Sequence, residues 1–310
     1  MRQAIAALAF GWSLSACATV PPAEPEWELV WSDEFDMADI DRTKWDFDID
    51  CWGGANDERQ CYTDHARNAR IEDGVLVIEA HEEETTGPAI PIHRRKPGVK
   101  VPVDTKPYTS ARMVTRGKAA WQYGKIEVRA QLPQGQGTWP AIWMMPEHDA
   151  YGLWALSGEI DVMEAVNLGV PCEGCPGGKE NTILGTLHFG GEPPENALKG
   201  DEVPYPPVLS GYHVFGLEWS AERMVWTVDG KPFAIRTASE WYSDAAPGNR
   251  LAPFDQPFHL ILNLAVGGRL PEGRGLGGFD PGDYPKRMKV DWVRIWQCAA
   301  DPATGSACER

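Results

Sequence analysis

Long apolar runs, helical periodicity and positive charge are all scarce in this 310-residue chain. No apolar segment approaches the ~20 residues that a membrane-spanning helix requires. No long stretch keeps a helical period, which argues against a helical fold. Lysine and arginine total 29 against 45 aspartates and glutamates, giving a formal net charge of −16. Phosphate contacts need clustered cations, so this charge argues against nucleic acid as a partner.

Short stretches of alternating apolar and polar residues recur instead, separated by glycine and proline. The clearest lie at 74–80, 124–130, 212–219, 224–228, 258–265 and 288–297, and Asp229-Gly230 is a hairpin signal. Many short strands between turn residues predict an all-β sandwich or barrel. The sequence has no internal repeat, and 43% of its residues are hydrophobic. We therefore expect one domain with one large core.

Three carboxylates interrupt an apolar, β-favouring stretch, GEIDVMEAVN, at residues 158–167. Alternate side chains of a strand share a face, so Glu159 and Asp161 point the same way and Glu164 points the other way. A β-bulge between Asp161 and Glu164 would return Glu164 to the carboxylate face. Two such glutamates can act on a glycosidic bond as nucleophile and general acid. A solvated edge strand is the alternative, which the apolar residues between the acids disfavour.

The E-x-D-x-x-E signature, preceded by WPAIWMMP and followed by TLHFGG, resembles glycoside hydrolase family 16, and within it the laminarinase-like branch. The resemblance runs from residue 28 to residue 297. It implies a jelly-roll β-sandwich of two antiparallel sheets with a concave substrate cleft. It also implies endo-acting hydrolysis of β-1,3-glucan with retention of configuration and no catalytic cofactor. Glu159 is the expected nucleophile, Glu164 the acid and base, and Asp161 their assistant.

Other functions stay open at this stage. A hydrolase of mixed-linkage β-1,3-1,4-glucan or of a galactan is one alternative, although the spacing of the three acids favours the laminarinase type over the unbulged E-x-D-x-E of mixed-linkage enzymes. A non-catalytic glucan-binding lipoprotein is another, although it would have no use for both glutamates. The acidic surface favours a neutral glucan, because sulfated or uronic polymers would be repelled unless the cleft were locally basic.

Aromatic and polar side chains around the acids are expected to bind substrate, because sugar rings stack on aromatic planes. Trp139 and Trp143 share one face of the preceding strand, which the resemblance places in the cleft. Trp154 is expected near the nucleophile. His188, on the next strand, is expected beside Glu164, although a lone histidine is more often structural. The remaining candidates are Asn56, which the resemblance places at the cleft edge, Arg112 and Asn263.

Two stretches stand apart from this pattern. After Gly268, Arg269-Leu270-Pro271 replaces the tryptophan that is usual in the resembling family, so one stacking platform is expected to be missing. His93 to Lys106 is the one basic region, and its prolines mark it as a loop that favours a solvated over a functional role.

The resemblance also implies a structural calcium on the convex side of the sandwich. The matching positions are Glu34, Gly74 and Asp291, and oxygen ligands of this kind suit Ca²⁺. Three dispersed residues form no loop motif, so the residues alone would not reveal such a site.

The N-terminus predicts export. Residues 1–16 combine Arg2, an apolar run and small residues before Cys17, as in a signal peptide. Leu14-Ser15-Ala16-Cys17 resembles a bacterial lipobox, with Cys17 as the lipidated residue; an ordinary cleaved signal is the alternative. We expect a signal at 1–17, a tether at 18–26, the catalytic domain at 27–298 and a tail at 299–310. The protein would then be a monomeric cell-envelope lipoprotein, in the bacterial outer membrane, or secreted.

Six cysteines remain after Cys17, an even number suited to an oxidising compartment. Six cysteines allow 15 connectivities, and spacing favours neighbours: Cys51 with Cys61, Cys172 with Cys175, and Cys298 with Cys308. Half of a zinc site or a redox pair is the alternative for Cys172 and Cys175, but no second cysteine or histidine cluster lies at metal-ligand spacing.

Overall fold

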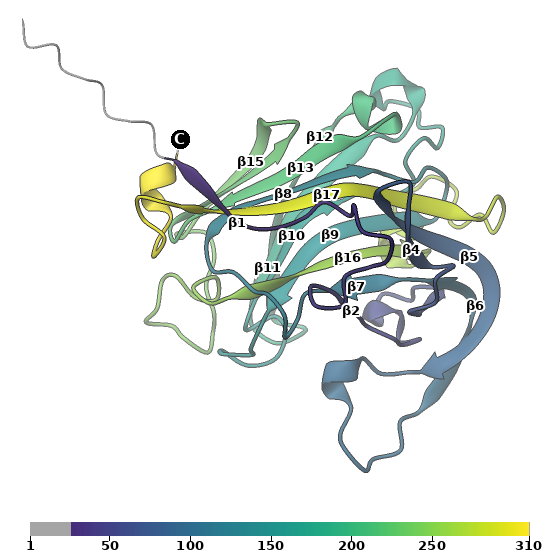
Figure 1. The fold of residues 1–310 in the computed structure, drawn as a ribbon, viewed down its shortest axis with the longest axis horizontal. Coiled ribbons are helices and arrows are strands. Elements are labelled where there is room, and N and C mark those ends of the chain that lie inside the picture. Colours follow the sequence, from purple (N-terminus) through teal and green to yellow (C-terminus); the bar gives the residue numbers. More distant parts are fainter. Residues whose placement is uncertain (1–25, 310) are drawn as a thin grey trace, which may run out of the picture.

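Two stacked β-sheets make up the computed structural model, which describes residues 26–309 (Figure 1). The larger sheet has ten strands, and the path through eight of them is β15-β14-β13-β8-β17-β5-β6-β3. Strand β1 pairs with β17, and β4 pairs with β5. The strands are β1 (Trp27–Asp33), β3 (Gln60–Tyr62), β4 (Ala69–Glu72), β5 (Val75–Pro88), β6 (Val103–Ser110), β8 (Gly124–Gln131), β13 (His213–Trp219), β14 (Arg223–Val228), β15 (Lys231–Thr237) and β17 (Lys286–Cys298).

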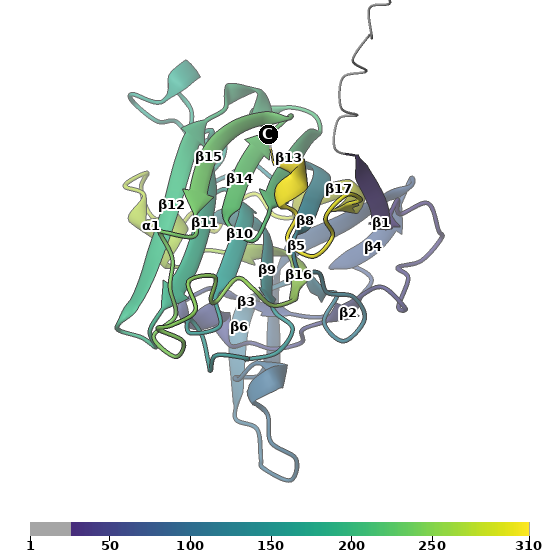
Figure 2. The ribbon, with the colours of Figure 1, turned by 90° about the vertical axis from the view of Figure 1, so that its left-hand side faces the viewer.

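The smaller sheet has seven strands in the order β12-β11-β10-β9-β16-β7-β2 and lies against the first (Figure 2). All of its pairs are antiparallel, whereas β3 and β6 of the larger sheet form a short parallel pair. The strands are β2 (Asp46–Phe47), β7 (Arg112–Val114), β9 (Thr138–Pro146), β10 (Glu159–Glu164), β11 (Thr182–Gly190), β12 (Asn196–Pro204) and β16 (Phe258–Val266). The predicted all-β sandwich is confirmed.

Helical structure in residues 26–309 is confined to single turns, and none of it is long and apolar enough to cross a membrane. The short helices are η1 (Gly53–Ala55), η2 (Ile92–Arg94), η3 (Pro176–Gly178), η4 (Pro206–Leu209), α1 (Arg269–Gly273) and η5 (Ser306–Cys308).

The core fills the space between the sheets because each strand turns every second side chain inward. On β8, Ile126, Val128 and Ala130 are buried and alternate with half-exposed residues. Strand β16 is buried along its whole length, as expected for a central strand covered on both faces. The Asp229-Gly230 turn joins β14 to β15 with positive φ at both residues, the conformation of a type I′ hairpin.

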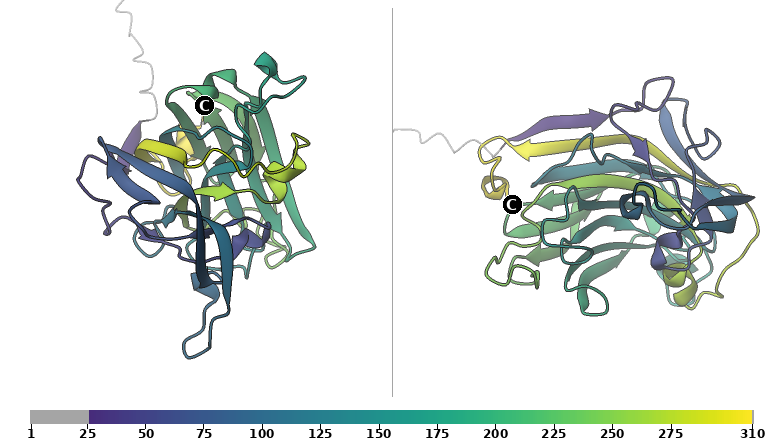
Figure 3. Two further views of the ribbon diagram at one scale, coloured as in Figure 1. Left: turned by 90° about the vertical axis from the view of Figure 1, so that its right-hand side faces the viewer. Right: turned by 90° about the horizontal axis from the view of Figure 1, so that it is seen from below.

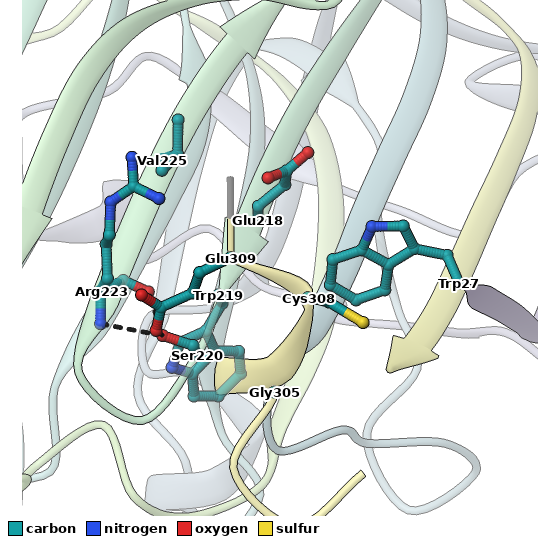
Figure 4. A pocket seen from close by; sticks show the side chains of 9 residues that line it. All are labelled: Trp27, Glu218, Trp219, Ser220, Arg223, Val225, Gly305, Cys308 and Glu309. Carbon is teal, nitrogen blue, oxygen red and sulfur yellow. Dashed lines mark hydrogen bonds between the residues drawn. The ribbon is translucent and has the colours of Figure 1, made fainter. Parts of the chain in front are cut away.

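Three disulfides join the cysteine pairs that their spacing favours: Cys51–Cys61, Cys172–Cys175 and Cys298–Cys308. The last of these fastens the C-terminal segment to the end of β17. That segment closes over a small pocket at the end of β13 and β14, where Ser220 donates a hydrogen bond to Glu309 (Figure 4). The pocket has room for about one water molecule and no sugar ring. Cys17 lies outside the described residues.

Candidate active site

The three acids lie on β10, inside the seven-stranded sheet between β9 and β11. Pairing with both neighbours is regular through Asp161 and then slips by one residue before Glu164. This slip is a β-bulge, and it turns Glu164 to the face that carries Glu159 and Asp161. The predicted bulge is therefore confirmed.

Glu159 is half-buried and held by an indole. Trp154 Nε1 donates a hydrogen bond of 2.8 Å to Glu159 Oε2, and His188 Nε2 lies 3.7 Å from Glu159 Oε1. Burial and the neighbouring charge of Asp161 raise the pKa of Glu159 to about 7, against the opposing effects of His188 and Trp154. The indole binds Glu159 Oε2 and leaves Oε1 without a bond to the indole. The charge of His188 favours the ionised form of Glu159.

Glu164 is held by a second indole in the same manner. Trp139 Nε1, on β9, donates a hydrogen bond of 2.8 Å to Glu164 Oε1. Burial, then the charge of Asp161, raises the pKa of Glu164 to about 8. A carboxyl with a pKa raised this far can hold a proton near neutral pH, as a general acid must.

His188 lies opposite Glu159 in the β10–β11 register, not beside Glu164 as its sequence position suggested. Its Nε2 is 3.2 Å from Asp161 Oδ2, and its ring lies 5.7 Å from that of Trp154. Burial acts to lower the pKa of His188, but the hydrogen bond to Asp161 and the surrounding acids outweigh burial and raise it to about 10. The prediction was wrong because β11 runs antiparallel to β10, so Glu164, which follows Glu159 by five residues, lies at the level of Leu184 and not of His188.

Trp143 is the third indole on this face, and buried side chains hold its ring in place. Its Nε1 donates a hydrogen bond of 2.6 Å to Asn263 Oδ1, and Asn263 Nδ2 donates one of 3.1 Å to the Tyr62 hydroxyl. The Arg112 guanidinium lies over the rings of Tyr62 and Trp143, at 4.4 and 5.4 Å. Asn263 and Arg112 are buried and support Trp143, and their direct contact with substrate stays a prediction.

Asn56 lies at the end of η1, in a loop that meets the segment after Gly268. Its main-chain oxygen accepts a hydrogen bond of 2.8 Å from the Arg269 nitrogen. Arg269 is exposed and forms an ion pair of 2.8 Å with Asp57. A charged pair therefore occupies the place where the resembling family usually carries tryptophan. Asn56 is half-exposed and remains a predicted substrate contact.

Trp226, on β14 of the opposite sheet, contributes to the site without being detectable in the sequence. Its Nε1 donates a hydrogen bond of 2.8 Å to the main-chain oxygen of Asp161, at the start of the bulge. Its ring fills the space above Gly185 on β11, where a Cβ atom would lie 2.4 Å from the indole. Only the stacking of the two sheets brings this tryptophan to the bulge.

Two of the three predicted calcium ligands, the carboxylates of Glu34 and Asp291, are engaged with arginines. Glu34 accepts two hydrogen bonds from Arg294, at 3.0 and 2.8 Å, and Asp291 pairs with Arg129. Calcium takes six to eight oxygen ligands, mostly from free carboxylates and carbonyls. Carboxylates already neutralised by guanidinium groups fit poorly, so the structure does not support the calcium prediction.

Two other clusters among residues 26–309 bring three ligand-type side chains together. One is Cys172, Cys175 and Glu180, whose sulfurs are joined in a disulfide and cannot act as thiolates. The other is Glu159, Asp161 and His188. In this cluster His188 Nε2 lies 3.2 Å from Asp161 Oδ2, so these two side chains pair with each other.

Comparison with known proteins shows which family the chain that carries these acids resembles. Residues 62–294 match the model of the glycosyl hydrolases family 16. A β-glucanase of Rhodothermus marinus is 42% identical over 88% of this chain and 86% of its own length. A glucan endo-1,3-β-glucosidase A1 of Niallia circulans is 38% identical over 89% of this chain, which spans 39% of that relative. The solved laminarinase of Rhodothermus marinus superposes with a TM-score of 0.70 at 38% identity, covering 88% of this chain and 98% of that one.

Proposed function

This chain belongs to the glycosyl hydrolases family 16, and on that premise we propose that it is an endo-acting β-1,3-glucanase of the laminarinase type. One observation carries the proposal: the bulge of β10 turns Glu159 and Glu164 to one face, each fixed by its own tryptophan. A retaining glycosidase needs two carboxyls on one face, one to attack the anomeric carbon and one to donate a proton.

In the first step, a carboxylate oxygen of Glu159 attacks the anomeric carbon of the bound glucan. The glycosidic C–O bond breaks, and its electron pair takes the proton of Glu164 to leave as a hydroxyl. Trp154 and Trp139 hold the two carboxyls in place with one hydrogen bond each.

In the second step, Glu164, now ionised, takes a proton from water. The water oxygen attacks the anomeric carbon from the side that the leaving group vacated, and the ester bond to Glu159 breaks. Two inversions restore the original configuration. The reaction needs no cofactor. Asp161 and the His188 cation both lie close to Glu159, and their opposite charges act on its pKa in opposite directions.

A product time course tests the substrate. Purified protein without residues 1–17 is given laminarin, mixed-linkage β-1,3-1,4-glucan and agarose in parallel, and the products are separated by chromatography. Mixed-length oligosaccharides released early from laminarin would support endo action on β-1,3-glucan. Cleavage of another polymer alone would refute the substrate class.

The catalytic assignment is tested separately with Glu159→Gln. This variant should keep glucan binding, measured by calorimetry, and lose turnover. Unchanged hydrolysis would refute the role of Glu159. Chromatography with light scattering would test the expected monomer.

Export and lipidation are also part of the proposal, supported by the lipobox-like LSAC at residues 14–17 and by three disulfides in the domain that follows. The protein would be anchored to the cell envelope through Cys17. Mass spectrometry of the N-terminus tests this, with Cys17→Ser as the unlipidated comparison; an unmodified N-terminus in the native protein would refute it.

A further inference from the structure

A hairpin arm projects from the sandwich beside the edge of the seven-stranded sheet (Figure 3). Strand β5 pairs with β17 only as far as Ala80; from His81 it pairs with β6 and extends away from the sheet. The basic arm, named for the charge of its tip, comprises residues 82–110 and carries η2 near that tip. Its acidic residues, Glu82, Glu83, Glu84 and Asp104, lie outside residues 89–103. Residues 103–106, predicted as part of a loop, are the start of β6.

The tip of the basic arm is strongly cationic in a protein of net charge −16. Residues 89–103 contain Arg94, Arg95, Lys96 and Lys100 and no acidic residue. Within residues 26–309, none of these four cations has a carboxylate at ion-pair distance. Most other arginines in the described chain do, as in the pairs of Arg59 with Glu272 and Arg250 with Glu222. The tip therefore presents uncompensated positive charge.

The loop is held in place against the sheet edge. Arg95 Nε donates a hydrogen bond of 3.0 Å to the Ile90 oxygen, and its Nη2 donates one to the Ile49 oxygen, just after β2. The Arg94 guanidinium lies over the Trp52 ring at 5.2 Å. The Cys51 nitrogen donates a hydrogen bond of 2.7 Å to the Pro88 oxygen. These contacts position a charged surface instead of leaving a freely solvated loop.

Apolar side chains alternate with the cations on this surface. Ile92, Val99 and Val103 are 45%, 60% and 67% exposed. Pyranose rings offer apolar C–H faces to such side chains, and charged substituents would meet the cations between them. The combination fits a sugar polymer that bears negative groups better than it fits a neutral glucan.

The position of the basic arm indicates an extended partner. The smaller sheet runs β10-β9-β16-β7-β2 from the catalytic strand to its edge, and the arm contacts Ile49 just after β2. Four strand spacings of ~4.8 Å put β2 about 19 Å from the catalytic strand, and the arm lies beyond β2. The first described strand begins on the side of the molecule opposite the arm (Figure 1).

We infer that the basic arm binds an anionic polysaccharide, through sulfate or carboxylate groups, at a site separate from hydrolysis. Such binding holds the protein on an acidic glycan while the acids of β10 act on another chain. Arg94, Lys96 and Lys100 supply the exposed charges, and Arg95 anchors the loop.

Affinity electrophoresis in native gels tests the inference. The gels contain a sulfated galactan, a polyuronate or neutral dextran. The arm variant is R94S/K96S/K100S. The matched control is K179S/K231S/K289S, which lowers the net charge by the same three units outside the arm. Both are checked for folding by circular dichroism and for laminarin hydrolysis, which should equal that of the native protein.

We expect at least one polyanion to retard the native protein and the control at about 20 mM salt and not at about 500 mM salt. At the lower salt concentration, retardation of the arm variant should be at least fivefold weaker than that of the native protein. Retardation by the sulfated polymer alone would assign sulfate, and by the polyuronate alone carboxylate. The inference would be overturned if neither polyanion retarded the native protein, or if the two variants were retarded equally. It would also be overturned by arm-dependent binding to phosphatidylglycerol vesicles without binding to either polymer.

Discussion

Replacing His188 with glutamine should move the pH profile of hydrolysis to higher pH. The His188 cation lies 3.7 Å from Glu159 and lowers the pKa of that carboxyl. Without the cation, Glu159 keeps its proton to higher pH, so the acidic limb of the pH profile, where the nucleophile ionises, moves to higher pH. His188 also lowers the pKa of Glu164, so the loss of the acid at high pH should be delayed as well.

The size of the shift follows from the separation of the charges. Two unit charges 3.7 Å apart interact by about 1 kcal/mol in a medium with the dielectric constant of water. One pKa unit corresponds to about 1.4 kcal/mol, so the acidic limb should move up by at least ~0.8 pH unit. Both side chains are largely buried, which lowers the effective dielectric constant and increases the effect.

The assay is kcat/KM on a soluble laminarin oligosaccharide across the pH range, for native protein and His188→Gln. His213→Gln is the matched control, because that histidine pairs with Asp229 at 2.7 Å, away from the three acids. The control profile should match the native one. An acidic limb that stays in place or moves to lower pH in His188→Gln would refute the electrostatic role of this histidine.

Three further predictions concern stability and positioning. The folded pKa of Glu164 is about 8, above its ordinary value of 4.5, so the contribution of this carboxyl to stability is lost as pH rises between these values. The Tm of Glu164→Gln should therefore exceed that of the native protein by a few degrees at pH 8 and by less at pH 5. An equal Tm difference at both pH values would contradict this. Trp226→Phe removes the hydrogen bond to the Asp161 oxygen and should cost about 1–3 kcal/mol in urea unfolding and lower kcat, whereas unchanged kcat would separate the bulge from catalysis. Asn263→Leu leaves the Trp143 indole without its acceptor and should raise KM more than it lowers kcat in laminarin kinetics, an unchanged KM arguing against a positioning role.

The sequence was sufficient wherever a local pattern decides the structure. Alternation of apolar residues predicted the strands of the core, because burial of one strand face requires it. Parity along 159–164 predicted the bulge, because two catalytic carboxyls on one face require one extra residue between them. Spacing favoured the three disulfides that the structure contains.

Tertiary structure decided the partners of each side chain. The strand register placed His188 beside Asp161 and Glu159, and sheet stacking brought Trp226 to the bulge from 65 residues away in the sequence. Asn263 is buried and accepts a hydrogen bond from Trp143, a contact that the sequence did not predict. Local pattern gives the face on which a residue lies, whereas register and the packing of one sheet on another decide what that residue touches, because both depend on contacts between distant parts of the chain.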